Sequence, residues 1–239
     1  MADQGAVRWW LDERSFAGPE HLDAGYVAGY DAKAQFDPTS DIDVLRSLGL
    51  DRGSSLIDLG AGTGTFAMAA AELGATVMAV DVSPAMVAAI RRRCHDRGLD
   101  GVEVVEAGFL SYEHRGPPAD FAFSRNALHQ LPDFWKVIAL RRVAAMLRPG
   151  GILRLRDLAY DFAPAQVEGA FGAWLANAAS DPATGYTAGD LAQHIKTEFS
   201  TFSWLLEPML ERTGFEIIDR DTRWSVHAAY TCRKLSDTL

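Results

Sequence analysis

The sequence of 239 residues predicts an α/β fold built on a mostly parallel sheet. Three observations lead to this prediction. Between residues 55 and 157, short β-like apolar runs alternate with stretches of helical spacing. A turn that contains three glycines follows the first apolar run, where a buried strand is expected to end. Two more strand-like runs close the chain and bring the expected number of strands to seven.

Each expected element follows from its local pattern of apolar and polar residues. Strands are expected at residues 55–59, 76–81, 102–107, 120–124, 152–157, 216–221 and 225–232. Helices are expected at residues 66–73, 84–97, 133–147, 191–199 and 201–215. Ser83 and Pro84 form an N-cap followed by a proline at the first helical position, and Gly98 ends that helix. Thr187 and Asp190 have the spacing of a capping box.

The chain is expected to form a single domain over residues 1–239. Its parts are an N-terminal cap (1–50), a core (51–157), an insert (158–205), and a final helix with two closing strands (206–239). The cap is aromatic and helical, with Tyr26 and Tyr30 one turn apart on one helix face. Residues 158–199 are expected to contain loops and helices but no strand.

Composition and charge narrow the classes of partner. A formal net charge of −9 disfavours a nucleic-acid partner, because such binders usually present a basic face. The basic run at residues 91–93 lies in an expected helix and is interpreted as a solvated face. No apolar run approaches the ~18 residues that a membrane span needs, so we expect no membrane partner. The oligomeric state is left open between a monomer and a homodimer.

Cysteine usage and the first residues bear on localisation and metal binding. Cys94 and Cys232 lie far apart and have no metal-ligand spacing, and no metal site is expected. Reduced thiols are typical of a cytoplasmic protein. The first residues lack the basic region and apolar core of a signal peptide. We therefore expect a cytoplasmic location.

The turn in the stretch SLIDLGAGTG, residues 55–64, has three possible interpretations. A P-loop requires Lys and Ser or Thr after the last glycine, but Thr65 and Phe66 follow here. A dinucleotide fingerprint requires glycine at the first, third and sixth positions, and Thr65 occupies the sixth position counted from Gly60. The third interpretation is a GxGxG turn that holds a different nucleoside.

With this turn, the chain resembles the class I S-adenosylmethionine (SAM)-dependent methyltransferases of the bacterial small-molecule type. The resemblance covers residues 50–160 and rests on four motifs in order: LIDLGAGTG, VDVSPAM, DFAFSRNALHQL and MLRPGGIL. It implies a Rossmann-like seven-stranded sheet with helices on both faces. It also implies SAM as cofactor, S-adenosylhomocysteine as product, and methyl transfer to O, N or C of a small-molecule acceptor. The insert would then lie on the acceptor side.

The resemblance also implies a set of cofactor-binding residues. They are Tyr30, Gly60, Ala61, Gly62, Gly64, Asp81, Val82, Met86, Gly108, Phe109 and Asn126. Asp81 would accept the ribose hydroxyls, although it could simply cap the next helix. Val82 and Met86 would contact adenine, or pack in the core. Gly108 stands where many relatives have an acid that binds the adenine amino group, so backbone groups near Gly108 and Phe109 are expected to replace it.

Residues near the tip of the fourth strand are candidates for catalysis. Asn126 is expected to bind the methionine part of SAM or the acceptor, and Tyr30 to lie near the methionine carboxylate. His129 is the candidate general base, with a structural role as its alternative. Further candidates for the pocket or its lid are Trp9, Trp10, Tyr26, Arg156, Asp157, Trp174, His194, Glu198 and Phe202.

Two other functions remain open at this stage. The first is an RNA or protein methyltransferase of the same fold, which would require a basic stripe beside the pocket. The second is a protein that binds SAM without catalysis. An intact glycine turn does not separate these alternatives from a small-molecule enzyme.

Overall fold

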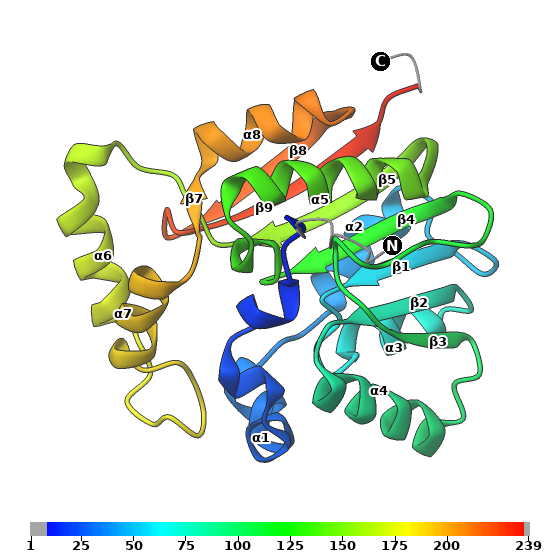
Figure 1. The fold of residues 1–239 in the computed structure, drawn as a ribbon, viewed down its shortest axis with the longest axis horizontal. Helices are drawn as coiled ribbons and strands as arrows, with labels where there is room; N and C mark the ends of the chain where they lie inside the picture. Colours follow the sequence, from blue (N-terminus) through cyan, green and yellow to red (C-terminus); the bar gives the residue numbers. More distant parts are fainter. Residues whose placement is uncertain (1–8, 237–239) are drawn as a thin grey trace, which may run out of the picture.

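The computed structural model describes residues 9–236, which form a seven-stranded sheet with helices on both faces (Figure 1). The strand order is β3-β2-β1-β4-β5-β9-β8. The strands are β1 (Ser55–Leu59), β2 (Thr76–Asp81), β3 (Val102–Glu106), β4 (Ala119–Arg125), β5 (Leu147–Asp157), β8 (Phe215–Arg223) and β9 (His227–Lys234). Strands β1 to β5 pair in parallel, and β9 pairs antiparallel with both β5 and β8. The expected fold class is confirmed.

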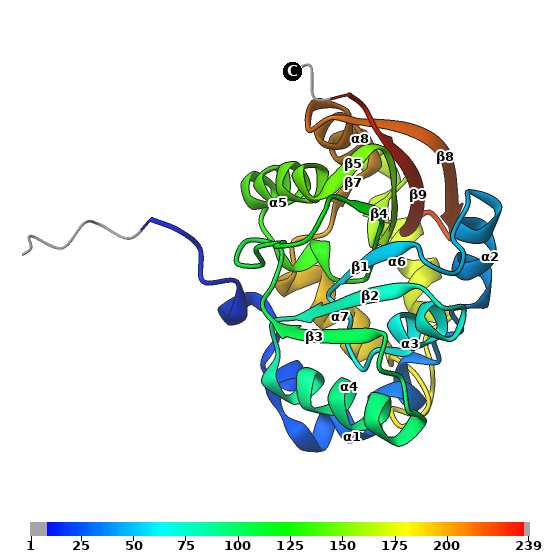
Figure 2. The ribbon, with the colours of Figure 1, turned by 90° about the vertical axis from the view of Figure 1, so that its right-hand side faces the viewer.

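Two hydrophobic layers pack the helices against the sheet. Helices α5 (Asp133–Met146) and α8 (Ser203–Arg212) cover one face, where Leu140 and Leu206 are buried with Ile57. Helices α2 (Thr39–Ser47), α3 (Thr65–Glu72) and α4 (Pro84–Arg97) cover the other face. Leu45 and Phe66 are buried there. Figure 2 shows the sheet between α5 on one side and α2 and α3 on the other.

The expected helix caps form as their residue types require. The Ser83 hydroxyl oxygen accepts the backbone N–H of Met86 at 3.2 Å and starts α4. Gly98 ends this helix in the left-handed region, with φ of 64°. The Thr187–Asp190 capping box starts α7 (Ala188–Thr197). These local signals therefore set the helix boundaries.

The insert differs from its expected structure. Helices α6 (Val167–Ala176) and α7 lie beyond one end of the main sheet (Figure 1), but a short parallel sheet joins the ends of the insert. This sheet pairs β6 (Ala159–Tyr160) with β7 (Thr201–Phe202). The expectation of no strand in 158–199 is thus wrong for β6, and α8 begins at 203 rather than 201. Two-residue strands form because a distant segment offers backbone partners, which periodicity does not reveal.

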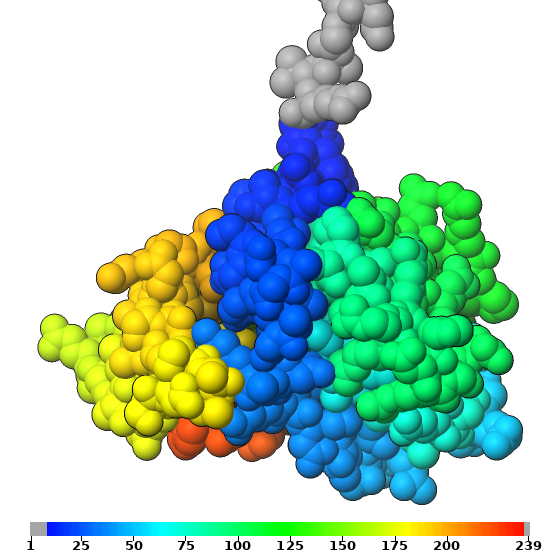
Figure 3. Space-filling model, turned by 90° about the horizontal axis from the view of Figure 1, so that it is seen from below, coloured from blue at the N-terminus to red at the C-terminus, as the bar shows by residue number. Residues whose placement is uncertain are grey.

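The N-terminal segment lies between the insert and the α4 side of the domain, as Figure 3 shows. It contains the short helices η1 (Glu13–Phe16) and η2 (Pro19–Leu22), followed by α1 (Ala24–Ala34). Helix α1 contacts α4 through Val27, which is buried with Met86 and Ala89. Of the helices described, none is long and apolar enough to cross a membrane.

A buried ion pair ties α2 to the sheet. Asp41 is fully buried, and its two carboxylate oxygens accept from the guanidinium groups of two β5 residues. The distances are 3.0 Å to Arg154 Nε and 2.6 Å to Arg156 Nη1. Arg154 is itself 7% exposed, so loss of Asp41 would leave a buried guanidinium without its counter-charge.

We expect Asp41→Ala to lower the free energy of unfolding by about 3–5 kcal/mol. Asp43→Ala is the matched control in the same helix, because Asp43 forms an exposed ion pair with Arg46 at 3.9 Å. That change should cost less than about 0.5 kcal/mol. Urea unfolding of both variants measures the difference. Equal effects would contradict a structural role for the buried pair.

Candidate active site

The glycine turn follows β1 and has a backbone that only glycine adopts without strain. Gly60, Gly62 and Gly64 have φ of 71°, 56° and 82°. A Cβ atom at Gly60 would also lie 2.3 Å from the Cβ of Ala127, which follows β4. The turn therefore packs directly against the segment after β4. Replacement of Gly60 would separate these two segments.

Asp81, the last residue of β2, holds this turn through its carboxylate. One oxygen accepts the N–H of Gly62 at 2.8 Å, and the other accepts the N–H of Ser83 at 2.8 Å. Burial raises the pKa of Asp81 to about 6, against the opposing effect of these two backbone donors. A carboxylate is thus fixed at the carboxyl end of the parallel strands, where ligands bind in open α/β sheets.

Two cavities border this edge of the sheet. The larger has a volume of about 1100 Å³ and is lined by the N-terminal segment, the segment after β4, the start of β9 and the insert. The smaller has a volume of about 250 Å³ and is lined by residues 10–14 together with Val82, Glu106, Ala107 and Ser111. The N-terminal segment contributes to both walls.

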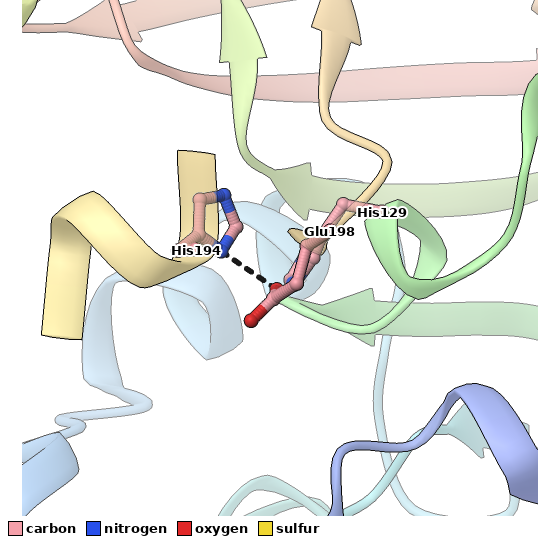
Figure 4. A group of neighbouring side chains, drawn as sticks. All are labelled: His129, His194 and Glu198. Carbon is pink, nitrogen blue, oxygen red and sulfur yellow. Dashed lines mark ion pairs between the residues drawn. The ribbon is translucent and has the colours of Figure 1, made fainter. Parts of the chain in front are cut away.

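A histidine–carboxylate cluster lies in the wall of the larger cavity (Figure 4). His129 comes from the short helix η3 (Leu128–Gln130) after β4, whereas His194 and Glu198 come from α7 and the residue after it. Nε2 of His129 lies 2.8 Å from Oε2 of Glu198, and Nδ1 of His194 lies 2.6 Å from the same oxygen. Nδ1 of His129 contacts Oδ1 of Asp157, the last residue of β5.

The charges around His129 decide its protonation. Burial alone would lower the pKa of His129, but the charges and hydrogen bonds of Asp157 and Glu198 raise it to about 9. Burial would likewise raise the pKa of Glu198, but its bonds to His129 and His194 hold it well below its usual value. His129 is therefore protonated at neutral pH in this arrangement and has no free lone pair. A base role would require Glu198 to move and the ring to lose a proton.

Comparison with known proteins agrees with this architecture. Residues 56–151 match the family model described as a methyltransferase domain. The chain is 28% identical over 134 residues to an uncharacterized methyltransferase of Geobacillus sp.. The matched region covers 56% of this chain and 61% of the relative. The chain is 36% identical over 100 residues to the cypemycin N-terminal methyltransferase of Streptomyces sp., covering 41% of this chain and 40% of the relative. Residues 56–151 of the chain thus carry a methyltransferase domain.

Solved structures show the same fold. A sarcosine dimethylglycine methyltransferase from Galdieria sulphuraria, described as putative, has a TM-score of 0.63 at 16% identity, with 82% of this chain and 83% of that chain covered. Phosphoethanolamine N-methyltransferase 2 from Haemonchus contortus, solved with SAM, has a TM-score of 0.69 at 16% identity, with 95% and 60% covered. The chain spans less than two thirds of the first curated relatives it matches, at 61%, 22% and 40% of their lengths.

Many of the candidate residues from the sequence meet around the larger cavity. They are Tyr26, Tyr30, Asn126, His129, Arg156, Asp157, Trp174, His194 and Glu198. Asn126 has a left-handed backbone with φ of 50°, and its N–H donates to the carbonyl of Arg156 at 2.8 Å. A strained non-glycine residue at this position is typical of a functional site.

The other candidates lie elsewhere. Val82 and Trp10 line the smaller cavity. Met86 and Phe109 are buried in hydrophobic clusters, and Phe202 packs in the cluster that contains Tyr160. Trp9 is 68% exposed and stacks on Trp135. Of this group, only Val82 and Trp10 border a cavity.

The structure adds residues that the sequence did not point to. A Cβ at Gly108 would lie 2.4 Å from the carboxylate of Glu13, which accepts the N–H groups of Leu110 and Ser111 at 2.9–3.2 Å. A distant acid thus fixes the main chain after β3. Arg125 and His227 line the larger cavity, and burial lowers the pKa of His227 to about 4. Nothing in the local sequence marks these contacts, because each depends on tertiary structure.

Asp58 in β1 is a second buried acid beside the turn, and its Oδ2 has no hydrogen-bond partner among the described residues. Burial and the charge of Asp81 raise its pKa to about 8. The folded protein therefore keeps a proton that the unfolded chain releases above its ordinary pKa of 3.8. The protonated Asp58 side chain therefore contributes to the free energy of unfolding. This contribution is complete at low pH and is lost as the pH rises towards 8.

We expect Asp58→Asn to gain stability relative to the wild type as the pH rises. The free energy of unfolding of Asp58→Asn minus that of the wild type should rise by at least about 1 kcal/mol between pH 5 and pH 8. The reason is that asparagine does not titrate. Urea unfolding at several pH values measures this shift. Asp96→Asn, an exposed acid on α4, serves as the control and should follow the wild type. Parallel curves for Asp58→Asn and the wild type would contradict the buried proton.

Proposed function

We propose that the protein transfers the methyl group of SAM to an O, N or C atom of a small-molecule acceptor and releases S-adenosylhomocysteine. The observation that carries this proposal is the cavity of about 1100 Å³ beside the tip of β4. Cavities of this size hold small ligands, and walls from four parts of the chain favour an enclosed acceptor. Relatives include a phosphoethanolamine N-methyltransferase and a ubiquinone biosynthesis O-methyltransferase, which supports this acceptor class.

The residues around the glycine turn fit SAM. Glycines at positions 60, 62 and 64 allow a nucleoside to approach the main chain closely. In this proposal, Asp81 accepts the ribose hydroxyls, and the adenine enters the cavity of about 250 Å³ beside Val82. Glu13 supports that cavity by holding the backbone that follows Gly108.

Arg125 supplies a positive charge for the amino-acid end of SAM. Its guanidinium lies 4.1 Å from the ring centre of Phe36, lines the larger cavity and interacts electrostatically with Tyr30. Burial lowers its pKa, and within residues 9–236 no carboxylate forms an ion pair with it. The nearby Asp41 is already bound by two other arginines. We therefore assign Arg125 and Tyr30 to the methionine carboxylate.

Catalysis in this proposal depends mainly on alignment. SAM, when bound, supplies a methyl group activated by the sulfonium. The protein holds the acceptor behind that methyl and excludes water through the N-terminal segment and the insert. Asn126 is placed at the cavity wall to orient SAM or the acceptor. The base role of His129 stays a prediction.

We expect Asp81→Ala to weaken SAM binding at least tenfold, or about 1.4 kcal/mol, because the ribose hydroxyls lose their acceptor. Isothermal titration calorimetry with SAM measures the affinity, and thermal unfolding checks that the variant folds. Asp96→Ala is the control. Unchanged affinity in Asp81→Ala would remove the ribose assignment, and a labelled-SAM assay with a metabolite extract tests turnover separately.

The role of Arg125 is tested with SAM and decarboxylated SAM. We expect Arg125→Met to weaken SAM binding by about 10- to 100-fold, because a charge-assisted hydrogen bond is lost. The wild type should show a similar loss when it binds decarboxylated SAM, whereas Arg125→Met should bind the two ligands equally well. If the variant still prefers SAM as strongly as the wild type does, another residue binds the carboxylate.

A further inference from the structure

We propose that His129, His194 and Glu198 form a binding site for a divalent first-row transition-metal ion at the wall of the larger cavity. One ligand comes from the core and two come from the insert (Figure 4). His194 and Glu198 are four residues apart, which places both on one side of the end of α7. No pattern in the sequence connects them with His129.

The three ligand atoms are close to the geometry of a metal site. One possible ligand atom from each of His129, His194 and Glu198 lies within 4.8 Å of the other two. Nε2 of His129 and Nδ1 of His194 lie 2.8 and 2.6 Å from Oε2 of Glu198. Ligands at about 2.0–2.2 Å from an ion lie about 3.0–3.4 Å apart, so both nitrogen–oxygen contacts would lengthen by a few tenths of an ångström around an ion.

The remaining ring nitrogens have partners that orient both imidazoles. Nδ1 of His129 contacts Asp157, whose other oxygen accepts the backbone N–H of His129 at 3.0 Å. Nε2 of His194 lies 2.8 Å from the hydroxyl oxygen of Ser200. These contacts turn the other nitrogen of each ring towards Glu198. A carboxylate behind a metal-binding histidine is the usual supporting arrangement.

Charge and ligand type select the class of ion. Asp157 and Glu198 together carry two negative charges, which match a divalent cation in a region where His129 is only 4% exposed. Two imidazoles and one carboxylate suit ions such as Zn²⁺, Fe²⁺ or Co²⁺. Mg²⁺ and Ca²⁺ prefer sites made of oxygen ligands.

Three protein ligands leave coordination positions open, and all three ligand residues line the larger cavity. An ion here would bind an oxygen atom of the acceptor and hold the insert to the core. The statement about the acceptor rests on the proposed function, whereas metal binding does not. This proposal differs from the expectation from the sequence that the protein has no metal site.

The test is a Co²⁺ titration of the full chain after chelation, without SAM. Visible absorption reports the ligand set, and elemental analysis gives the stoichiometry. We expect one ion per chain and a loss of affinity of more than about 100-fold in both His194→Ala and Glu198→Gln. His95→Ala removes an exposed histidine on α4 and is the control that should bind like the wild type.

Each outcome supports or overturns the site. Binding to the wild type with loss in both variants supports it. No binding, or binding that both variants retain, overturns it and assigns any bound ion to exposed histidines. SAM calorimetry and thermal unfolding on the same variants show that they fold. If the wild type binds the metal but not SAM, the proposed function is contradicted and the metal site is not. If it binds SAM but not the metal, only the metal site is contradicted.

Discussion

The contact between the Asp81 carboxylate and the glycine turn is the interaction on which the site depends. The N–H of Gly62 donates to Asp81 at 2.8 Å, and the missing side chain at Gly60 lets the turn pack against Ala127. The ends of β1, β2 and β4 are thereby held at one edge of the sheet. For the proposed SAM site, the fixed carboxylate and bare main chain at this edge would be in place before the ligand binds, which lowers the cost of binding.

Segments outside the sheet complete the pocket. The N-terminal segment lies over the turn, where the Tyr30 ring is 3.8 Å from the position of a Cβ on Gly62. The insert closes the other side and joins the core at His129, whose carbonyl accepts the N–H of Phe199 at 2.9 Å. In the proposed function, the sheet positions the cofactor, and the N-terminal segment and the insert shape the space for an acceptor. Such a division allows acceptor specificity to change without rebuilding the sheet.

The sequence predicted the parts of the site that depend on local structure. Strand ends, the glycine turn and the caps at Ser83 and Thr187 are confirmed, because their signals lie within a few residues. Contacts between distant segments were missed. Glu13 acts on residues 95 or more positions away, and the β6–β7 pairing joins two ends of the insert. The proposed metal site was missed for the same reason, because His129 and His194 are separated by 65 residues.

A crystal structure of the full chain grown with S-adenosylhomocysteine tests the proposed SAM site most directly. We expect both ribose hydroxyls to bind Asp81, the nucleoside to lie against the main chain of residues 60–64, and the thioether sulfur to face the larger cavity. A structure at saturating ligand in which this edge of the sheet is empty, or in which the nucleoside binds elsewhere, would contradict the proposed SAM site.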